Sequence, residues 1–262
     1  MGGPVISEQD GRRITITLNR PEALNAIDDA LLEALTEALV AAASAPDCRV
    51  VVLRGAGRVF CAGGDVDDMP VLRSEAQYRS RRLPAEQALA RAVRSLDRPL
   101  IAQLHGAAIG GGCVLAALCD LRVAAEGTRF SLPETAFGTT ASLGGIYLIT
   151  RIVGLGRAFE LLYLGDRFDA QRALEIGFVN RVVPAHDLDG EVNRLADRLA
   201  EQFPREMTLT RRAILEGLEL DFESAARRET EAAMKAHLSG DVVEGFKRAR
   251  ARMPTRKSRE GA

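Results

Sequence analysis

Residues 98–120 read RPLIAQLHGAAIGGGCVLAALCD, and the rest of the chain is organised around them. This stretch predicts a buried strand over residues 100–104, then a glycine-rich turn, then an apolar helix that opens near Cys113. Three consecutive glycines, residues 110–112, let a ligand approach the backbone closely. The first N–H groups of the helix lack partners within it, and the helix dipole adds partial positive charge there. The segment therefore predicts a site for an anion, a phosphate or the developing oxyanion of a carbonyl.

The composition excludes several classes of protein. The 262 residues carry a net charge of −1, which gives no field for nucleic acid or a membrane surface. Aromatic residues make up only 5%, which weighs against base stacking. We find no export signal, and no apolar run reaches the roughly 18 residues that span a bilayer. The four cysteines form no CxxC pair, so we expect no metal and no disulfide, but reduced thiols in the cytoplasm.

Strands and helices alternate over the first 185 residues, which predicts an α/β fold with a parallel sheet covered by helices. Residues 66–83 are polar and basic and are expected to form a mobile cover. We divide the chain into a core, residues 1–186, and a C-terminal helical region, residues 187–262. The expected strands are 12–18, 49–54, 100–104, 121–124 and 178–183. Besides the helix that opens near Cys113, the expected core helices are 28–43, 84–96, 143–153, 157–164 and 170–176.

Two glycine-rich loops leave the carboxyl ends of strands in this plan. One is GAGRVFCAGGD, residues 55–65, and the other holds the glycines at 106 and 110–112. Ligands of such folds bind at loops off the carboxyl ends of strands. Two loops from two strands can direct two N–H donors at one oxygen, which fits an oxyanion hole better than a phosphate cradle.

Other chemistries are poorly supported. No P-loop is present, and GLGRAF at 154–159 has only two glycines of a dinucleotide fingerprint. Ser142 lacks the GxSxG elbow of a serine hydrolase. His105, Cys61 and Cys113 are expected to be structural, and Asp65 to tie its loop. Glu134, in LPET, is either a surface ion-pair partner or a carboxylate whose apolar pocket raises its pKa and makes it a proton carrier.

Five motifs together resemble the crotonase (enoyl-CoA hydratase/isomerase) superfamily, with the family's spacing from about residue 5 to 250. They are LNRPEALNA at 18–26, FCAGGD at 60–65, GAAIGGG at 106–112, CDLR at 119–122 and LGDRFDA at 164–170. The resemblance implies a spiral of ββα turns followed by C-terminal helices that mediate trimers or dimers of trimers. It also implies an acyl-CoA thioester as substrate, with no bound cofactor.

The resemblance implies a site residue by residue. The oxyanion donors would be the N–H groups of Ala62 and Gly111, and the catalytic carboxylate would be Glu134. Substrate contacts would come from neighbouring positions: Ala23, Leu24, Gly63, Gly64, Asp65, Gly110, Gly112, Val114 and Ser142.

The chain departs from the hydratase pattern at two of these positions. Hydratases of the family use two glutamates, and the first falls on Val114, which cannot hold water or transfer a proton. Ser142 replaces a glycine and does not supply the aspartate of some other branches. Because one base suffices to move a double bond, we expect an isomerase-like enzyme in which Glu134 shuttles the proton. A hydratase, a thioester hydrolase and a non-catalytic acyl-CoA-binding relative remain as alternatives.

Overall fold

The computed structural model describes residues 2–65 and 74–252. The chain divides into two compact units, Met1–Glu201 and Gln202–Ala262. The sequence placed this boundary at residue 186 instead. The difference comes from α8, Leu188–Ala200, whose apolar side chains join the core of the first unit.

A six-stranded sheet forms the centre of the first unit, in the order β1-β2-β3-β4-β6-β9. Only the β1–β2 pair is antiparallel, and the other neighbours are parallel as predicted. The sequence analysis missed β1, whose side chains are almost all exposed and so show no apolar alternation. The strands are β1 Val5–Asp10, β2 Arg13–Leu18, β3 Val50–Gly55, β4 Leu100–Leu104, β6 Leu121–Ala125 and β9 Arg181–Val183.

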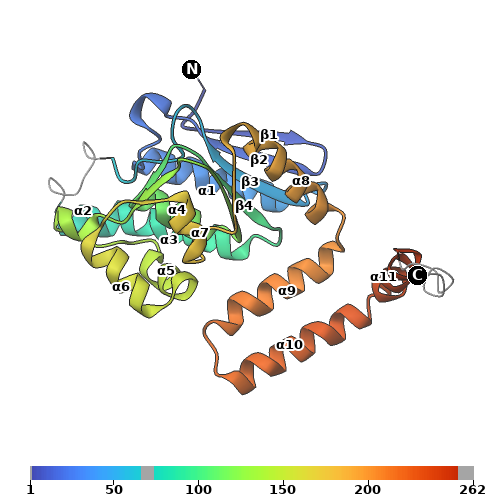
Figure 1. The fold of residues 1–262 in the computed structure, drawn as a ribbon. Helices are drawn as coiled ribbons and strands as arrows, with labels where there is room; N and C mark the ends of the chain where they lie inside the picture. Colours follow the sequence, from blue (N-terminus) through green and yellow to red (C-terminus); the bar gives the residue numbers. More distant parts are fainter. Residues whose placement is uncertain (1, 66–73, 253–262) are drawn as a thin grey trace, which may run out of the picture. The chain divides into compact units, whose positions relative to one another are not determined.

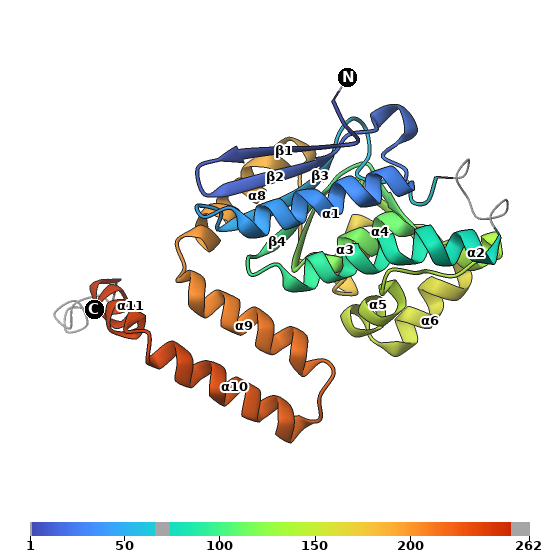
Figure 2. The same cartoon turned by 180° about the vertical axis from the view of Figure 1, so that it is seen from behind.

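Helices cover both faces of this sheet. One face carries Val50, Val52 and Ile101 and packs against α8 (Figure 1). The other face carries Val51 and Leu53 and packs against α1 (Asp29–Ser44), α3 (Leu83–Ser95) and α4 (Gly111–Leu118). Helices α1 and α3 lie side by side over it (Figure 2). Alternate residues of β3 are therefore buried on opposite faces, which explains its continuous apolar sequence.

Helix α1 shows how the sequence directs this packing. The Asp28 side chain accepts a hydrogen bond from the Leu31 N–H at 2.7 Å and so caps the helix. Leucines 31, 32, 35 and 39 recur at helical spacing, and all four are buried. Each contributes about 1.5–3 kcal/mol relative to an exposed position.

A second, smaller sheet begins within the glycine-rich segment after β4, and its strand order is β5-β7-β8. Its strands are β5 Ala107–Ile109, β7 Arg129–Ser131 and β8 Phe168–Asp169. Strands of two or three residues are too short for a periodic signal, and the sequence analysis missed all three. This sheet holds the segment that follows β4 beside the segment that leads to Glu134.

The remaining helices of the first unit are α2 Glu75–Gln77, α5 Gly145–Val153, α6 Leu155–Leu164 and α7 Ala170–Glu175. The cover expected at 66–83 lies partly outside the described residues, because the description stops at 65 and resumes at 74. Its second half is helical: α2 runs through a π-helical turn, Tyr78–Arg82, into α3.

The second unit is helical, as predicted. It contains α9 Pro204–Gly217, α10 Phe222–His237 and α11 Asp241–Arg252, and α9 packs against α10. Pro204 stands in the first turn of α9, where its missing N–H breaks no helical hydrogen bond. No helix in the described ranges combines the length and hydrophobicity needed to cross a membrane.

Candidate active site

The two glycine-rich loops meet along a short stretch of backbone. Cys61 N–H donates to the Ala107 carbonyl at 3.1 Å, and the Ile109 N–H donates to the Cys61 carbonyl at 3.0 Å. Gly112 permits this approach, since a Cβ there would lie 2.3 Å from the Cys61 carbonyl oxygen. The loops after β3 and β4 therefore form one rigid unit, as their positions predicted.

A third segment, residues 19–27, fastens this unit from the other side. The side-chain amide of Asn25 is fully buried and donates to the carbonyls of residues 56, 59 and 60. The neighbouring Leu24 carbonyl accepts the Ala62 N–H at 3.0 Å. Sequence reasoning did not single out Asn25, although an asparagine tolerates the positive φ of 55° that it adopts here.

This contact corrects the expected pair of oxyanion donors. The Ala62 N–H is already used by Leu24 and is not available to a ligand. The Gly64 N–H, two residues further on, has no hydrogen-bond partner among the described residues, and neither has the N–H of Gly111 at the start of α4. A Cβ added to Gly111 would lie 3.8 Å from the Gly64 nitrogen, so these peptide groups are neighbours. The available pair is Gly64 and Gly111.

These donors open into a pocket of about 700 Å³. Of the residues predicted for the site, the pocket is lined by Ala62, Gly63, Gly64, Asp65, Gly110, Gly111, Val114, Glu134 and Ser142. The other three predicted residues do not line the pocket. The Leu24 carbonyl accepts the Ala62 N–H, Gly112 is buried against Cys61, and Ala23 lies in the 3₁₀ turn that precedes Leu24.

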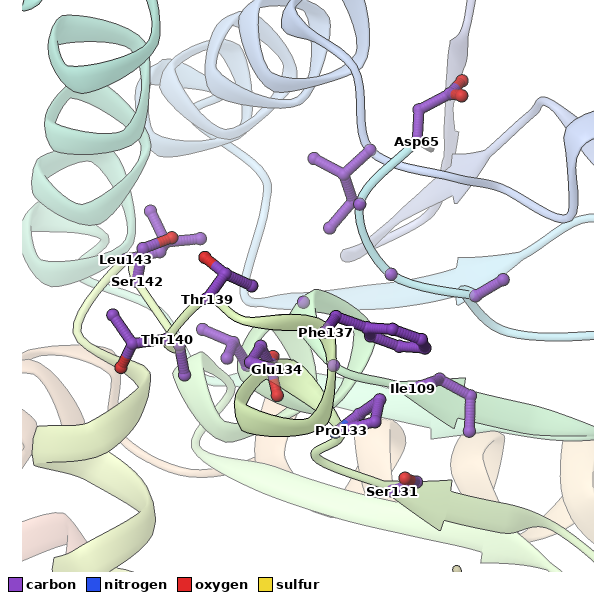
Figure 3. Close-up of a pocket in the computed structure, with 18 of the residues that line it drawn as sticks. Asp65, Ile109, Ser131, Pro133, Glu134, Phe137, Thr139, Thr140, Ser142 and Leu143 are labelled. Atoms are coloured by element: carbon purple, nitrogen blue, oxygen red, sulfur yellow. The ribbon is translucent and has the colours of Figure 1, made fainter. Parts of the chain in front are cut away.

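Glu134 stands next to the donors, on a single 3₁₀ turn, Glu134–Phe137. The Glu134 carbonyl accepts the Thr139 N–H at 2.9 Å, which fixes the turn. A Cβ added to Gly110 would lie 3.0 Å from Glu134 Oε1, so the carboxyl group lies against the glycine that precedes Gly111. Figure 3 shows Glu134 between Ser142 and Leu143 on one side and Ile109 on the other.

The environment of Glu134 favours its protonated form. Oε2 is buried and has no hydrogen-bond partner among the residues that the structure describes. Burial raises the pKa of Glu134 above its usual value, and a hydrogen bond from its own peptide N–H offsets part of that rise. The sequence left a surface ion pair and a raised pKa open for this residue, and the structure favours the raised pKa. A carboxyl group of this kind can both accept and return a proton near neutral pH.

Val114 lines the pocket at the position where hydratases of the family have a glutamate. Its side chain is buried on α4 and packs against Gly145, where an added Cβ would lie 2.5 Å from Val114 Cγ2. The apolar contact leaves no polar side chain at this position.

Besides Glu134 and Asp65, the pocket contains a further carboxylate, which sequence reasoning missed. Glu86, on α3, accepts hydrogen bonds on Oε1 from the Ser142 hydroxyl and from Arg82 Nε, each at 3.0 Å. Tyr78 lines the same part of the pocket. In the sequence Glu86 looks like any solvent-facing helix glutamate, so no local signal could have identified it.

The residues expected to be structural have structural contacts. His105 Nε2 lies 3.0 Å from the Gly57 carbonyl oxygen, and Asp65 is paired with Arg20 at 3.0 Å. All four cysteines are free and buried, and burial raises the pKa of Cys61 to about 12 and that of Cys113 still further. Neither thiol is a competent nucleophile near neutral pH. Among residues 2–65 and 74–252 no cluster of histidine, cysteine and acidic side chains could hold a metal ion.

A fold of this kind, with two backbone donors and a buried glutamate facing one pocket, is the arrangement of an acyl-CoA thioester enzyme of crotonase type. The chain belongs to the enoyl-CoA hydratase/isomerase family, whose model matches residues 9–252. The predicted family and fold class are thereby confirmed.

Individual relatives cover nearly the whole chain. A short-chain-enoyl-CoA hydratase of Clostridium acetobutylicum is 32% identical, over 93% of this chain and 97% of its own length. A crotonyl-CoA hydratase of Syntrophomonas wolfei is 34% identical, over 92% of this chain and 93% of its own. The crystal structure of an enoyl-CoA hydratase from Bacillus anthracis superposes with a TM-score of 0.89 at 33% identity, over 95% and 96% of the two chains.

Proposed function

We propose that this enzyme moves a double bond in an enoyl-CoA, from C3=C4 to C2=C3, with Glu134 as its single acid–base group. The observation that carries the proposal is the buried Oε2 of Glu134, which has no partner in the described part of the chain and belongs to a carboxyl group that lies against Gly110, the residue before the Gly111 donor. Val114 occupies the position at which the hydratase pattern has the other of its two glutamates.

The proposed reaction starts with the thioester carbonyl oxygen accepting hydrogen bonds from the Gly64 and Gly111 N–H groups. Glu134 removes a proton from C2, and the electron pair of the C–H bond delocalises over the dienolate and the carbonyl oxygen. The protonated Glu134 then delivers the same proton to C4, and the double bond reforms between C2 and C3. Each backbone donor contributes a factor of about 10²–10³ by stabilising the charge on that oxygen.

The apolar contact between Val114 and Gly145 supports isomerisation over hydration. Hydration needs both the activation of a water molecule and the protonation of the α-carbon, and two carboxylates share this work in the hydratase pattern. A valine offers neither, and it also keeps water away from the dienolate.

Hydration is the second candidate, because relatives that match nearly the whole chain include a short-chain-enoyl-CoA hydratase and a crotonyl-CoA hydratase. Glu134 alone would then serve both proton transfers. This reaction would be slower than in an enzyme with two glutamates, since acid–base groups typically contribute factors of about 10²–10⁴ each.

An assay with two substrates and three readouts tests the proposal. With 3-hexenoyl-CoA, isomerisation creates a conjugated thioester and absorbance rises; with crotonyl-CoA, hydration removes conjugation and absorbance falls. A thiol reagent in the same cuvette reports hydrolysis. We expect conjugation of 3-hexenoyl-CoA to be much faster than the other two reactions. Faster loss of crotonyl-CoA conjugation would assign a hydratase, thiol release a hydrolase, and tight binding without any reaction a binding protein.

We further propose that the enzyme assembles as a trimer or a dimer of trimers through its C-terminal unit. Large apolar side chains of this unit are exposed in the single chain: Ile214, Phe222, Met234, Leu238, Val243 and Phe246. Apolar surfaces of this kind mark interaction sites. Light scattering after gel filtration should give three or six times the mass of one chain, and a monomer would refute the proposal. The free thiols also support a cytoplasmic location, where cysteines stay reduced.

A further inference from the structure

The pocket lining includes a polar cluster made of Tyr78, Arg82, Glu86 and Ser142. Glu86 is its centre. Although the Glu86 side chain is only 9% exposed, it lines the pocket. Its Oε1 accepts both hydrogen bonds described above, from the Ser142 hydroxyl and from Arg82 Nε. Arg82 also contacts Asp29, with Nη1 3.5 Å from Oδ1, so Asp29 and Glu86 share this guanidinium group.

Two hydrogen-bonding groups of the cluster remain unused. Glu86 Oε2 has no donor within the described ranges of the chain, and the same holds for the Tyr78 hydroxyl. Burial raises the pKa of Tyr78, and the negative charge of Glu86 raises it further while Arg82 lowers it, so the phenol lies within electrostatic range of Glu86. A neutral phenol and a carboxylate oxygen therefore face the same part of the pocket.

The cluster is separate from the reacting end of the pocket. Figure 3 places Ser142 and Leu143 on the opposite side from Asp65 and Ile109, with Glu134 between them. Within the described ranges no hydrogen bond joins Glu134 Oε2 to the cluster. An acyl chain that runs from the Gly64 and Gly111 donors past Glu134 would extend toward the cluster.

The chemistry of the cluster selects among acyl chains. An alkyl chain would remove water from a carboxylate and a phenol without replacing their hydrogen bonds, which is unfavourable. A carboxylate at the end of the acyl chain would be repelled by the negative charge of Glu86. Arg82 would not offset this repulsion, because it already pairs with both Asp29 and Glu86. A hydroxyl group can donate to Glu86 Oε2 and accept from the Tyr78 phenol at the same time.

We propose that Glu86 and Tyr78 form a specificity subsite for acyl-CoAs that carry a hydroxyl group on the acyl chain, away from the thioester. The inference rests on the proposed function in one respect, namely that the pocket binds an acyl-CoA. It adds the chemical class of the acyl group.

Binding of saturated acyl-CoAs tests the subsite without depending on turnover. Isothermal titration would compare hexanoyl-CoA with 6-hydroxyhexanoyl-CoA, and octanoyl-CoA with 8-hydroxyoctanoyl-CoA, on the full chain. At one chain length or both, we expect the hydroxylated acyl-CoA to bind at least about 10-fold more tightly than the acyl-CoA without the hydroxyl group. A hydrogen bond to a charged group has an effect of this size. Glu86→Gln and Tyr78→Phe should each reduce this ratio toward one.

A matched control is Glu33→Gln, which removes an exposed carboxylate from α1 and should leave the ratio unchanged. Tyr78→Phe keeps the Arg82–Glu86 contact, so it tests the subsite even if Glu86→Gln lowers stability. A wild-type ratio of one at both lengths, or a ratio that neither variant changes, overturns the inference. If 3-hexenoyl-CoA is isomerised but the ratio is one, only the subsite fails. If the ratio is high without isomerisation, only the proposed reaction fails, and the absence of any acyl-CoA binding refutes both.

Discussion

Replacing Glu134 by glutamine removes the proposed proton carrier with almost no change in side-chain volume. The proton leaves C2 and returns at C4 through one group, so one substitution blocks both steps. An acid–base group typically contributes a factor of about 10²–10⁴. We expect kcat for 3-hexenoyl-CoA to fall toward the upper end of that range, by about 10⁴, with a much smaller change in acyl-CoA affinity, because Gly64 and Gly111 still bind the thioester.

The assay is the rise in absorbance on conjugation, combined with titration of hexanoyl-CoA to measure binding. Glu126→Gln, at an exposed position, is the matched control and should keep the wild-type rate. In the wild type, kcat/KM should rise with pH through the raised pKa of Glu134, because the ionised form is the base. A Glu134→Gln enzyme that retained more than about a tenth of the rate would refute the mechanism. A loss of activity in Glu134→Gln that came only from weaker acyl-CoA binding would also refute the mechanism.

Three further predictions concern the same pocket. Gly111→Ala should lower kcat/KM by about 100-fold, because its Cβ would stand 2.9 Å from Ile27 Cδ1 beside the donors; an unchanged rate would remove Gly111 from the oxyanion hole. Gly145→Ala should lower the free energy of unfolding by about 1–3 kcal/mol, measured by urea denaturation, because its Cβ would clash with Val114 Cγ2 at 2.5 Å. In a double-mutant cycle Val114→Ala should recover part of that loss, and strict additivity would contradict the clash. Finally, since its pKa is higher in the folded state, Glu134 contributes stability that is fully present below its usual pKa and is lost as pH rises through the raised value. The unfolding free energy of the wild type, measured relative to that of Glu134→Gln, should therefore fall as pH rises above the usual glutamate pKa, and a constant difference would contradict the raised pKa.

The sequence predicted the parts of the fold that carry a strong local pattern. The strand at 100–104 was predicted with the bounds that the structure has, and the helix of α1 to within a residue at each end. Strand β1 and the small second sheet were missed because exposed or very short strands have no apolar alternation. Helix α8 was assigned to the C-terminal region because its sequence is helical, and only the tertiary packing shows that its apolar stripe covers the central sheet.

The site was predictable as two loops and one carboxylate, but not atom by atom. A sequence does not reveal which N–H group of the loop at 61–65 already donates a hydrogen bond within the protein. In the structure the Ala62 N–H donates to the Leu24 carbonyl. The available donor is therefore Gly64. Glu86 and Tyr78 escaped notice for a different reason: they enter the pocket from α3 and the turn before it, and their distance in sequence from Ser142 hides the contact.

The central claim is that one carboxyl group carries one proton from C2 to C4. The most direct measurement uses 3-hexenoyl-CoA deuterated at C2, converted by the enzyme in ordinary water under single-turnover conditions and analysed by mass spectrometry and NMR. The proposed mechanism predicts deuterium at C4 of the product, because Glu134 returns to C4 the atom that it removed from C2. Product with only solvent hydrogen at C4, even in a single turnover, would mean that a second group or water delivers the proton, and would contradict the single-carboxylate account.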